Sequence, residues 1–127
     1  MSTTISAGAG IYAEGENITG VATTTVTAKT FLAITADRSG GNISVGTATA
    51  AGRVAGVAKF DAASGELVSI ARGNARVVKV TAGGTINAFA EVEVGTAGKA
   101  VTKASGVAVG YAVTGATSGG DAEISLY

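Results

Sequence analysis

The residues of this chain that could do chemistry are few, and the clearest candidates are two glutamates one residue apart. Glu91 and Glu93 alternate with valines in the segment EVEV, so a β-strand here would place both carboxylates on one face. Such a pair can serve in general acid–base catalysis or hold a hard cation. It is more often a solvated surface, and Arg72, Arg76 or Lys79 on a neighbouring strand could lie opposite. We therefore expect both glutamates to face solvent or a partner.

Nothing else in the sequence predicts a catalytic, metal-binding or cofactor-binding site. The chain has no histidine to titrate near neutral pH and no cysteine to act as a nucleophile or form a disulfide. The segment GAGIYA at 8–13 matches a dinucleotide-binding pattern, but that function needs a strand before it and a helix after it, and neither is expected. We predict no enzyme activity, no cofactor and no metal.

The composition indicates a small domain that gains stability from assembly. Its 127 residues include 20 Gly, 3 Phe, 3 Tyr and no Trp, so the core must be built mainly from small side chains. Burial is worth roughly 25 cal/mol per Å² of apolar surface, and small side chains yield less per residue. Binding to a partner or to a second copy would add to the stability.

The charges argue against a nucleic-acid partner, and the lack of a long apolar stretch argues against a membrane span. Nine basic and nine acidic residues cancel, and the basic ones are scattered singly along the sequence. No stretch approaches the ~20 apolar residues of a membrane-spanning helix. The N-terminal segment lacks the basic and apolar regions of a secretory signal, so we expect synthesis in a cytoplasm.

Short runs rich in Val, Thr and Ile, separated by Gly, Ser, Asn and Asp, predict an all-β fold. The absence of proline lets any of these runs occupy a central position in a sheet. We expect a small antiparallel β-sandwich or β-barrel built of short hairpins, as a single domain over residues 21–127. The predicted strands cover 21–27, 31–36, 43–48, 54–60, 67–72, 75–81, 91–94, 99–102, 107–113 and 122–126.

Two hairpins can be predicted in detail. In EVEVGTAGKAVT, a four-residue loop over 95–98 would place Val92 opposite Val101, with both valines in the core. A turn over 61–65 would use Asp and Ser for local hydrogen bonds and Gly65 for a positive φ.

One segment of the chain recurs. GVAKFDAASG at 56–65 returns as GVAVGYAVTG at 106–115, with the same residue at five of ten positions. Each copy precedes a strand-like segment, ELVSIAR or DAEISLY, so each is expected to form a strand–turn–strand hairpin. Two such hairpins suggest internal pseudo-symmetry or a recurrent hairpin pattern, whereas a solenoid would need three or more units.

The first twenty residues differ from the rest because they are polar and regularly interrupted by glycine. We assign residues 1–20 to an extended N-terminal arm. It would be either a frayed terminus or a segment that orders only against a partner.

Several small-residue elements run in a fixed order through the chain. They are a Gly-Val-Ala strand at 56–58, a turn over 62–65, a glycine at 73, a Gly-Lys-Ala turn at 98–100, a second Gly-Val-Ala at 106–108 and alternating apolar residues at 124–126. In this order, from about residue 10 to its end, the chain resembles the capsid decoration (head cement) proteins of tailed bacteriophages.

That resemblance implies a compact β fold that binds the outer surface of an assembled phage head and stabilises its lattice. The implied partners are the major capsid protein and further copies of this chain, as a homotrimer at three-fold or quasi-three-fold positions of the virion. The residues expected at contacts with the capsid or a neighbouring subunit are Ile5, Ile11, Tyr12, Glu14, Glu16, Arg72, Arg76, Glu91 and Glu93.

Two other functions stay open. The chain could be another β-structural protein of a virion, such as a tail-tube or fibre domain. It could also be a small carbohydrate-binding adhesive domain, which would need exposed aromatic rings to stack on sugars. Only Tyr12, Tyr111 and Tyr127 are available for that role, and they are widely spaced in the sequence.

Overall fold

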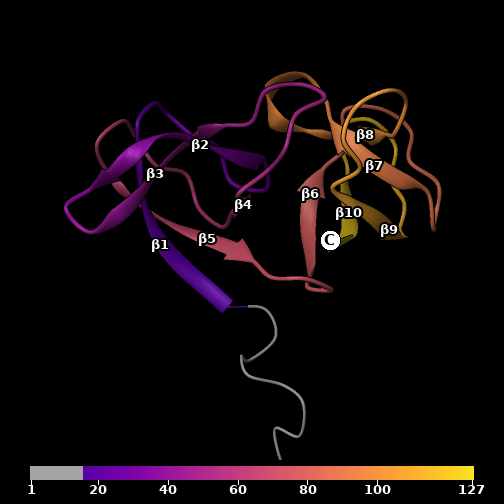
Figure 1. The fold of residues 1–127 in the computed structure, drawn as a ribbon. Helices are drawn as coiled ribbons and strands as arrows, with labels where there is room; N and C mark the ends of the chain where they lie inside the picture. The colour runs from indigo at the N-terminus through magenta and orange to yellow at the C-terminus, as the bar shows by residue number, and fades with distance from the viewer. Residues whose placement is uncertain (1–15) are drawn as a thin grey trace, which may run out of the picture.

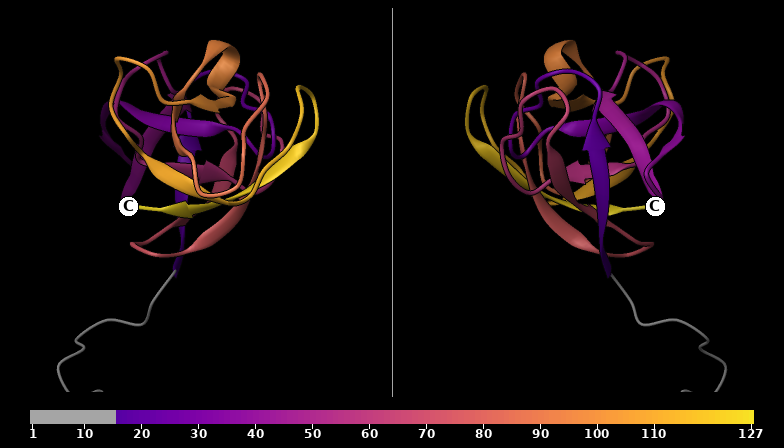
Figure 2. Two further views of the ribbon diagram at one scale, coloured as in Figure 1. Left: turned by 90° about the vertical axis from the view of Figure 1, so that its right-hand side faces the viewer. Right: turned by 90° about the vertical axis from the view of Figure 1, so that its left-hand side faces the viewer.

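The computed structural model describes residues 16–127 and confirms the all-β prediction. Ten strands form two groups that follow each other along the chain, over residues 16–72 and 77–126, and the groups lie side by side (Figure 1). Figure 2 views the second half and then the first half end-on.

The first half is a closed five-stranded barrel with the strand order β1-β3-β2-β4-β5. Strand β5 closes the barrel by pairing with β1. All pairs are antiparallel except β1 with β3, which is parallel, so the predicted antiparallel arrangement has one exception. The strands are β1 (Glu16–Ala22), β2 (Phe31–Ser39), β3 (Asn42–Thr47), β4 (Gly56–Ala58) and β5 (Leu67–Arg72).

The second half is a five-stranded antiparallel sheet with the order β6-β10-β9-β7-β8. A short 3-10 turn, η1 (Thr96–Gly98), joins β7 to β8, and it is the only helical segment in the part of the chain that the structure describes. The strands are β6 (Val77–Thr81), β7 (Glu91–Val94), β8 (Ala100–Thr102), β9 (Gly110–Thr114) and β10 (Asp121–Leu126).

The two halves are built on one plan, in which β1 to β5 correspond in order to β6 to β10. In the first half Val26 and Ala62 exchange two backbone hydrogen bonds, and in the second half Ile86 and Ala116 do the same. The hydrogen bond from Gly65 N to Ala22 O in the first half corresponds to that from Gly119 N to Ala82 O in the second. Likewise, the bond from Thr23 N to Val45 O corresponds to that from Gly83 N to Ala100 O. Leu32 lies opposite Gly56 in the first half, as Val92 lies opposite Gly110 in the second.

The recurrent hairpin of the sequence therefore reflects a duplicated plan, but its two copies align differently from the prediction. The structural equivalent of Gly56 is Gly110, because each lies opposite the second residue of the strand next to it. Gly106, its predicted equivalent, lies in the loop before β9.

Each half has its own core, and equivalent strands supply it. Ile70 of β5 and Ile124 of β10 are both fully buried, one in each core. Three buried residues of the first half, Phe31, Ala48 and Val57, instead pack into the core of the second half. The two halves are thus joined by apolar contact, which stabilises them as one unit.

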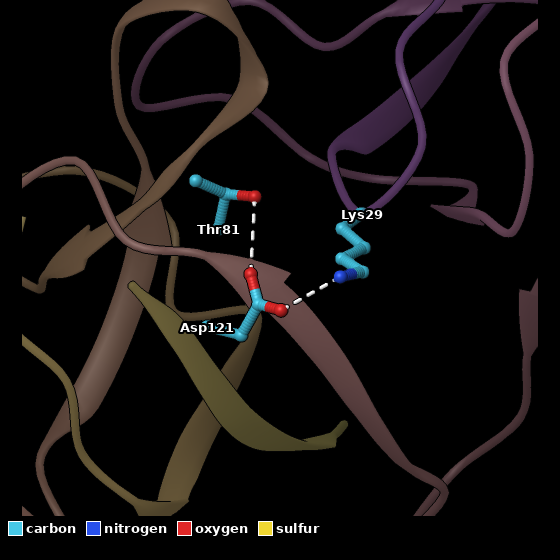
Figure 3. Close-up of polar contacts among 3 residues, drawn as sticks. All are labelled: Lys29, Thr81 and Asp121. Carbon is cyan, nitrogen blue, oxygen red and sulfur yellow. Dashed lines mark hydrogen bonds and ion pairs between the residues drawn. The ribbon is translucent and has the colours of Figure 1, made fainter. Parts of the chain in front are cut away.

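A polar contact also joins the halves (Figure 3). Lys29 Nζ, from the loop between β1 and β2, lies 2.7 Å from Asp121 Oδ2 at the start of β10. Thr81 Oγ1 donates to the other carboxylate oxygen at 3.5 Å, and Thr81 N donates to the Lys29 carbonyl at 2.9 Å. The hydrogen bond from Lys29 and the charge of that lysine hold the pKa of Asp121 below its ordinary value of 3.8.

The β7–β8 hairpin differs from its predicted register by one residue. Val101 lies opposite Glu93, and Val92 lies opposite Thr102. The loop between the paired residues Val94 and Ala100 holds five residues, 95–99. A 2.7 Å backbone hydrogen bond joins the first and last residues of this loop. Every cross-strand partner is therefore displaced by one position from the predicted one.

The turn over 61–65 is confirmed in part. Gly65 has a φ of 89°, as predicted. The polar side chains bond across the barrel instead of locally: Asp61 Oδ1 accepts from Ala28 N at 2.7 Å, and Ser64 Oγ donates to the Thr23 carbonyl at 2.9 Å.

Residues 16–20, which we assigned to the arm, belong to strand β1. Their backbone pairs with β5, where Glu16 lies opposite Arg72 and Gly20 lies opposite Val68. The strand ends at Ala22, so the predicted strand over 21–27 begins too late. The remainder of the predicted arm lies outside the described residues.

Candidate interaction surface

Three aromatic side chains gather on the outside of the second half. The rings of Phe89 and Tyr111 meet edge to face, with centroids 5.4 Å apart, and the rings of Tyr111 and Tyr127 are tilted at 48° with centroids 6.2 Å apart. Phe89 is 79% exposed. Exposed aromatic residues in contact with one another are typical of protein-binding surfaces.

The backbone that carries these rings explains their exposure. Phe89 has a φ of 68°, in the left-handed region that residues other than glycine rarely adopt. A 2.6 Å hydrogen bond from Phe89 N to the Ala112 carbonyl holds it there. Lys29, its equivalent in the first half, has a φ of 62° and bonds in the same way to Ala58. The duplicated plan therefore sets the position of Phe89.

Glu91 lies beside the aromatic rings. It is the cross-strand neighbour of Tyr111, and its Oε2 accepts a 2.6 Å hydrogen bond from the Tyr127 hydroxyl. Because the carboxylate stabilises the protonated phenol, this bond raises the pKa of Tyr127 above its ordinary value of 10.0. The contact fixes the ring of Tyr127 against the sheet.

A groove of about 480 Å³ lies on the first half and is lined by both arginine and apolar side chains. Arg53 and Arg72 contribute its charges, and Ile34, which is exposed, contributes an aliphatic side chain. Arg72 also lines a smaller pocket of about 120 Å³ together with Tyr127. The groove and the aromatic rings are thus linked through Arg72 and Tyr127.

We call this continuous region the aromatic–arginine surface. It comprises Phe89, Glu91, Tyr111 and Tyr127 from the second half, with Ile34, Arg53 and Arg72 from the first. Tyrosine, phenylalanine and arginine are the residue types enriched at protein interfaces. The surface has the chemistry of a binding site for another protein.

Three of the predicted contact residues belong to this surface or lie next to it. Arg72 and Glu91 are part of it, on strands β5 and β7. Glu16 is the cross-strand neighbour of Arg72 in the backbone ladder. Their role in contacts with a partner stays a prediction.

Glu93 is not on the surface, contrary to the expectation that it shares an exposed face with Glu91. Only 7% of it is exposed, and its Oε1 accepts a 3.0 Å hydrogen bond from Ala104 N. The loop after β8 covers it closely, because a Cβ added to Gly106 would collide with Glu93 Oε2. Non-local packing of that loop overrides the strand alternation.

Arg76 does not line the pockets that define the aromatic–arginine surface. It precedes β6 and lines another pocket, between the two halves, together with Lys29 and Lys79. Arg76 and Arg72, which were predicted together, therefore line different pockets.

Four predicted contact residues, Ile5, Ile11, Tyr12 and Glu14, lie outside the described residues.

Sequence analysis missed Phe89 and Arg53, and it treated Tyr111 and Tyr127 as widely spaced. In the strand order of the second half, β9 lies between β7 and β10, so residues far apart in the sequence become neighbours. The alternation of side chains along each strand could have suggested that Glu91 and Tyr111 point outward, but only the strand order brings them together.

Within residues 16–127, no three Asp or Glu side chains come close enough to hold a metal ion. The same residues contain no helix that is long and apolar enough to cross a membrane.

Comparison with known proteins finds similarity to solved structures. No protein-family model matches the chain, and no curated protein matches it. The structure is similar to the crystal structure of the N base of head fibre gp8.5 in bacteriophage phi29, with a TM-score of 0.75 and 24% sequence identity. The similarity covers 89% of this chain and 94% of that one. The two chains therefore share a fold.

Proposed function

We propose that this chain is a capsid decoration protein that binds the outer surface of an assembled phage head and stabilises the lattice. The observation that carries the proposal is the fold shared with a phage head-fibre base, over nearly the whole of both chains. The sequence resemblance to decoration proteins supports the same role through different residues, the small ones in its turns and strands.

The aromatic–arginine surface supports attachment through protein contacts. Phe89 and Tyr127 expose large rings, and Arg72 adds a guanidinium that can pair with a carboxylate of a partner. A protein that binds the assembled lattice and not its free subunits stabilises the lattice by mass action. The major capsid protein is the proposed partner, and the outside of the virion is the proposed location.

The duplicated plan supports assembly of the chain with itself. Phe31 and Val57 of the first half pack into the core of the second half. Their equivalents in the second half, Glu91 and Tyr111, lie on the aromatic–arginine surface. A second copy could pack its strand β1 against Glu91 and Tyr111, as β6 packs against Phe31 and Val57 within the chain. Repeated head to tail, such contacts form a ring when the rotation between copies closes, and a homotrimer is the proposed ring.

A second candidate is a head-fibre base domain, which the name of the similar structure favours. Both functions require binding to a phage head. The adhesive alternative gains one argument, because Tyr111 and Tyr127 are neighbours in the fold and not widely spaced. The tilt between their rings leaves no flat platform for a sugar, so we do not favour it.

The test is co-sedimentation of the purified protein with expanded heads of its source virus from which decoration has been stripped. We expect saturable binding at a fixed number of copies per capsomer. Phe89→Ser should weaken binding at least tenfold, because it removes the most exposed ring of the surface. The matched control is Phe60→Ser, which removes a ring that is 63% exposed in another part of the chain.

Heads that are competent for other ligands but do not bind this chain would rule out both head-binding functions. If Phe89→Ser weakens binding to heads no more than Phe60→Ser does, the aromatic–arginine surface is not the specific contact with the head. Light scattering of the same proteins reports whether Phe89→Ser also changes the number of copies in the free oligomer.

A further inference from the structure

A pocket between the two halves is rich in positive charge, and none of its lining residues belongs to the aromatic–arginine surface. Its volume is about 240 Å³. Although the basic residues are scattered in the sequence, four of the chain's nine Lys and Arg side chains line this one pocket. They are Lys29, Lys59, Arg76 and Lys79.

Arg76 is the most unusual of the four. It stands two residues before Val78, which is partly buried against the core, so strand alternation directs Arg76 toward the same inner side. Its Nη1 is buried and has no hydrogen-bond partner among the residues that the structure describes. An unpaired buried donor on a charged group is costly, so a ligand that supplies an acceptor would be favoured.

The two acids that accompany the lysines of this pocket do not pair with Arg76. Asp121 is engaged by Lys29 at 2.7 Å, the one ion pair among residues 16–127, and also by Thr81 (Figure 3). Glu123 lies opposite Lys79 in the ladder between β6 and β10. Among the described residues, four cations and no Asp or Glu line the pocket, which leaves it with an excess of positive charge.

The rest of the lining is apolar and includes Val57 and Val78. A phosphate, which is fully hydrated in water, would gain little from such a lining. A glutamate or aspartate side chain has an aliphatic stem that can lie against it, while the carboxylate pairs with the arginine fork. A cluster of four cations around one small pocket also differs from the extended basic stripe that follows a nucleic-acid backbone.

We propose that this pocket binds a carboxylate presented by an acidic side chain of a partner protein, with Arg76 as its principal ligand and Lys59 and Lys79 at its rim. The site rests on the geometry of the pocket alone. Only the identity of the partner as a virion protein rests on the proposed function.

The test uses the full chain labelled with nitrogen-15 and the peptide acetyl-Leu-Glu-Leu-amide, without phage heads. We expect saturable shifts of the amide signals of Lys59, Arg76 and Lys79, and no such shifts with acetyl-Leu-Gln-Leu-amide. Arg76→Met and Lys59→Gln should each weaken binding about fivefold or more, because each removes a cation from the pocket. The control Lys103→Gln, an exposed lysine elsewhere, should leave binding unchanged.

Lys59→Gln and Lys79→Gln keep the test decisive if Arg76→Met fails to fold, because both lysines are exposed. Equal binding of the glutamine peptide would overturn the proposal, as would unchanged binding by the lysine variants. Inorganic phosphate and a single-stranded oligothymidine are titrated in parallel. Tighter binding of either one would reject a protein carboxylate as the ligand. Since heads are absent, these results stand whatever the outcome of co-sedimentation.

Discussion

The two halves of this molecule share a backbone plan, yet only the first closes into a barrel. Strand β1 pairs with β3 through three residue pairs, whereas the equivalent strands β6 and β8 meet only at a bridge between Ala82 and Ala100. The β2–β3 hairpin is long, with strands of nine and six residues, while β8 has three. The short β8 has little edge to offer, so the second half stays an open sheet.

The halves differ more in surface chemistry than in backbone. Lys29 and Phe89 occupy equivalent positions with the same left-handed conformation, but one lines the basic pocket and the other the aromatic–arginine surface. Val57 and Tyr111 are also equivalent, and one is buried between the halves while the other lies on that surface. The duplicated frame thus carries two different surface chemistries.

The largest expected effect tests whether the two cores are equivalent. Ile70→Ala and Ile124→Ala remove the same atoms from matching, fully buried positions. Each should lower the free energy of unfolding by about 3 kcal/mol, through lost burial and a residual cavity. Urea denaturation measures both losses. A loss confined to one variant would show that one half contributes little to the cooperative fold.

A smaller effect is expected at two equivalent glycines. A Cβ added to Gly56 would lie 2.7 Å from the Ala71 carbonyl oxygen, and one added to Gly110 would collide with the Ser125 carbonyl oxygen. Gly56→Ala and Gly110→Ala should therefore each cost about 2 kcal/mol, because β4 and β9 must move away from their neighbours.

The control is Gly84→Ala, since an added Cβ there meets no atom within 4 Å. It should be neutral or slightly stabilising, and thermal unfolding followed by circular dichroism compares the three variants. Equal melting temperatures for all three would contradict the close strand packing that the halves have in common.

The smallest effect sharpens the contrast between Lys29 and Phe89. Lys29→Met removes the ion pair with Asp121. Methionine is unbranched like lysine, so the backbone at this positive-φ position is affected alike in both proteins. Because both side chains are partly exposed, the loss at neutral pH should be a few tenths of a kcal/mol.

The pH dependence of that loss has a definite sign. The folded-state pKa of Asp121 lies below its ordinary value of 3.8, so the stabilisation is present above that value and disappears as the pH falls through the folded-state pKa. The wild type and Lys29→Met should therefore converge in stability in strong acid. An NMR titration should find the pKa of Asp121 raised in the variant, and an unchanged value would remove Lys29 as its cause.

Strands whose signal is local could be predicted from the amino-acid sequence. The predicted strands at 67–72 and 91–94 coincide with β5 and β7, because alternating β-branched residues bounded by glycine or polar residues need no distant partner to be recognised. Glycine at position 65 likewise fixed a turn with positive φ. The recurrent hairpin indicated the duplication, though small residues left its alignment ambiguous.

The contacts that those strands make depend on the three-dimensional fold. The hairpin register depends on one extra residue in the loop over 95–99, and the burial of Glu93 depends on a loop that follows β8. Phe89, Tyr111 and Tyr127 become neighbours, and four separate cations line one pocket, through the strand order and the packing of the halves. Local sequence encodes the conformation of a segment, whereas these contacts join segments far apart along the chain.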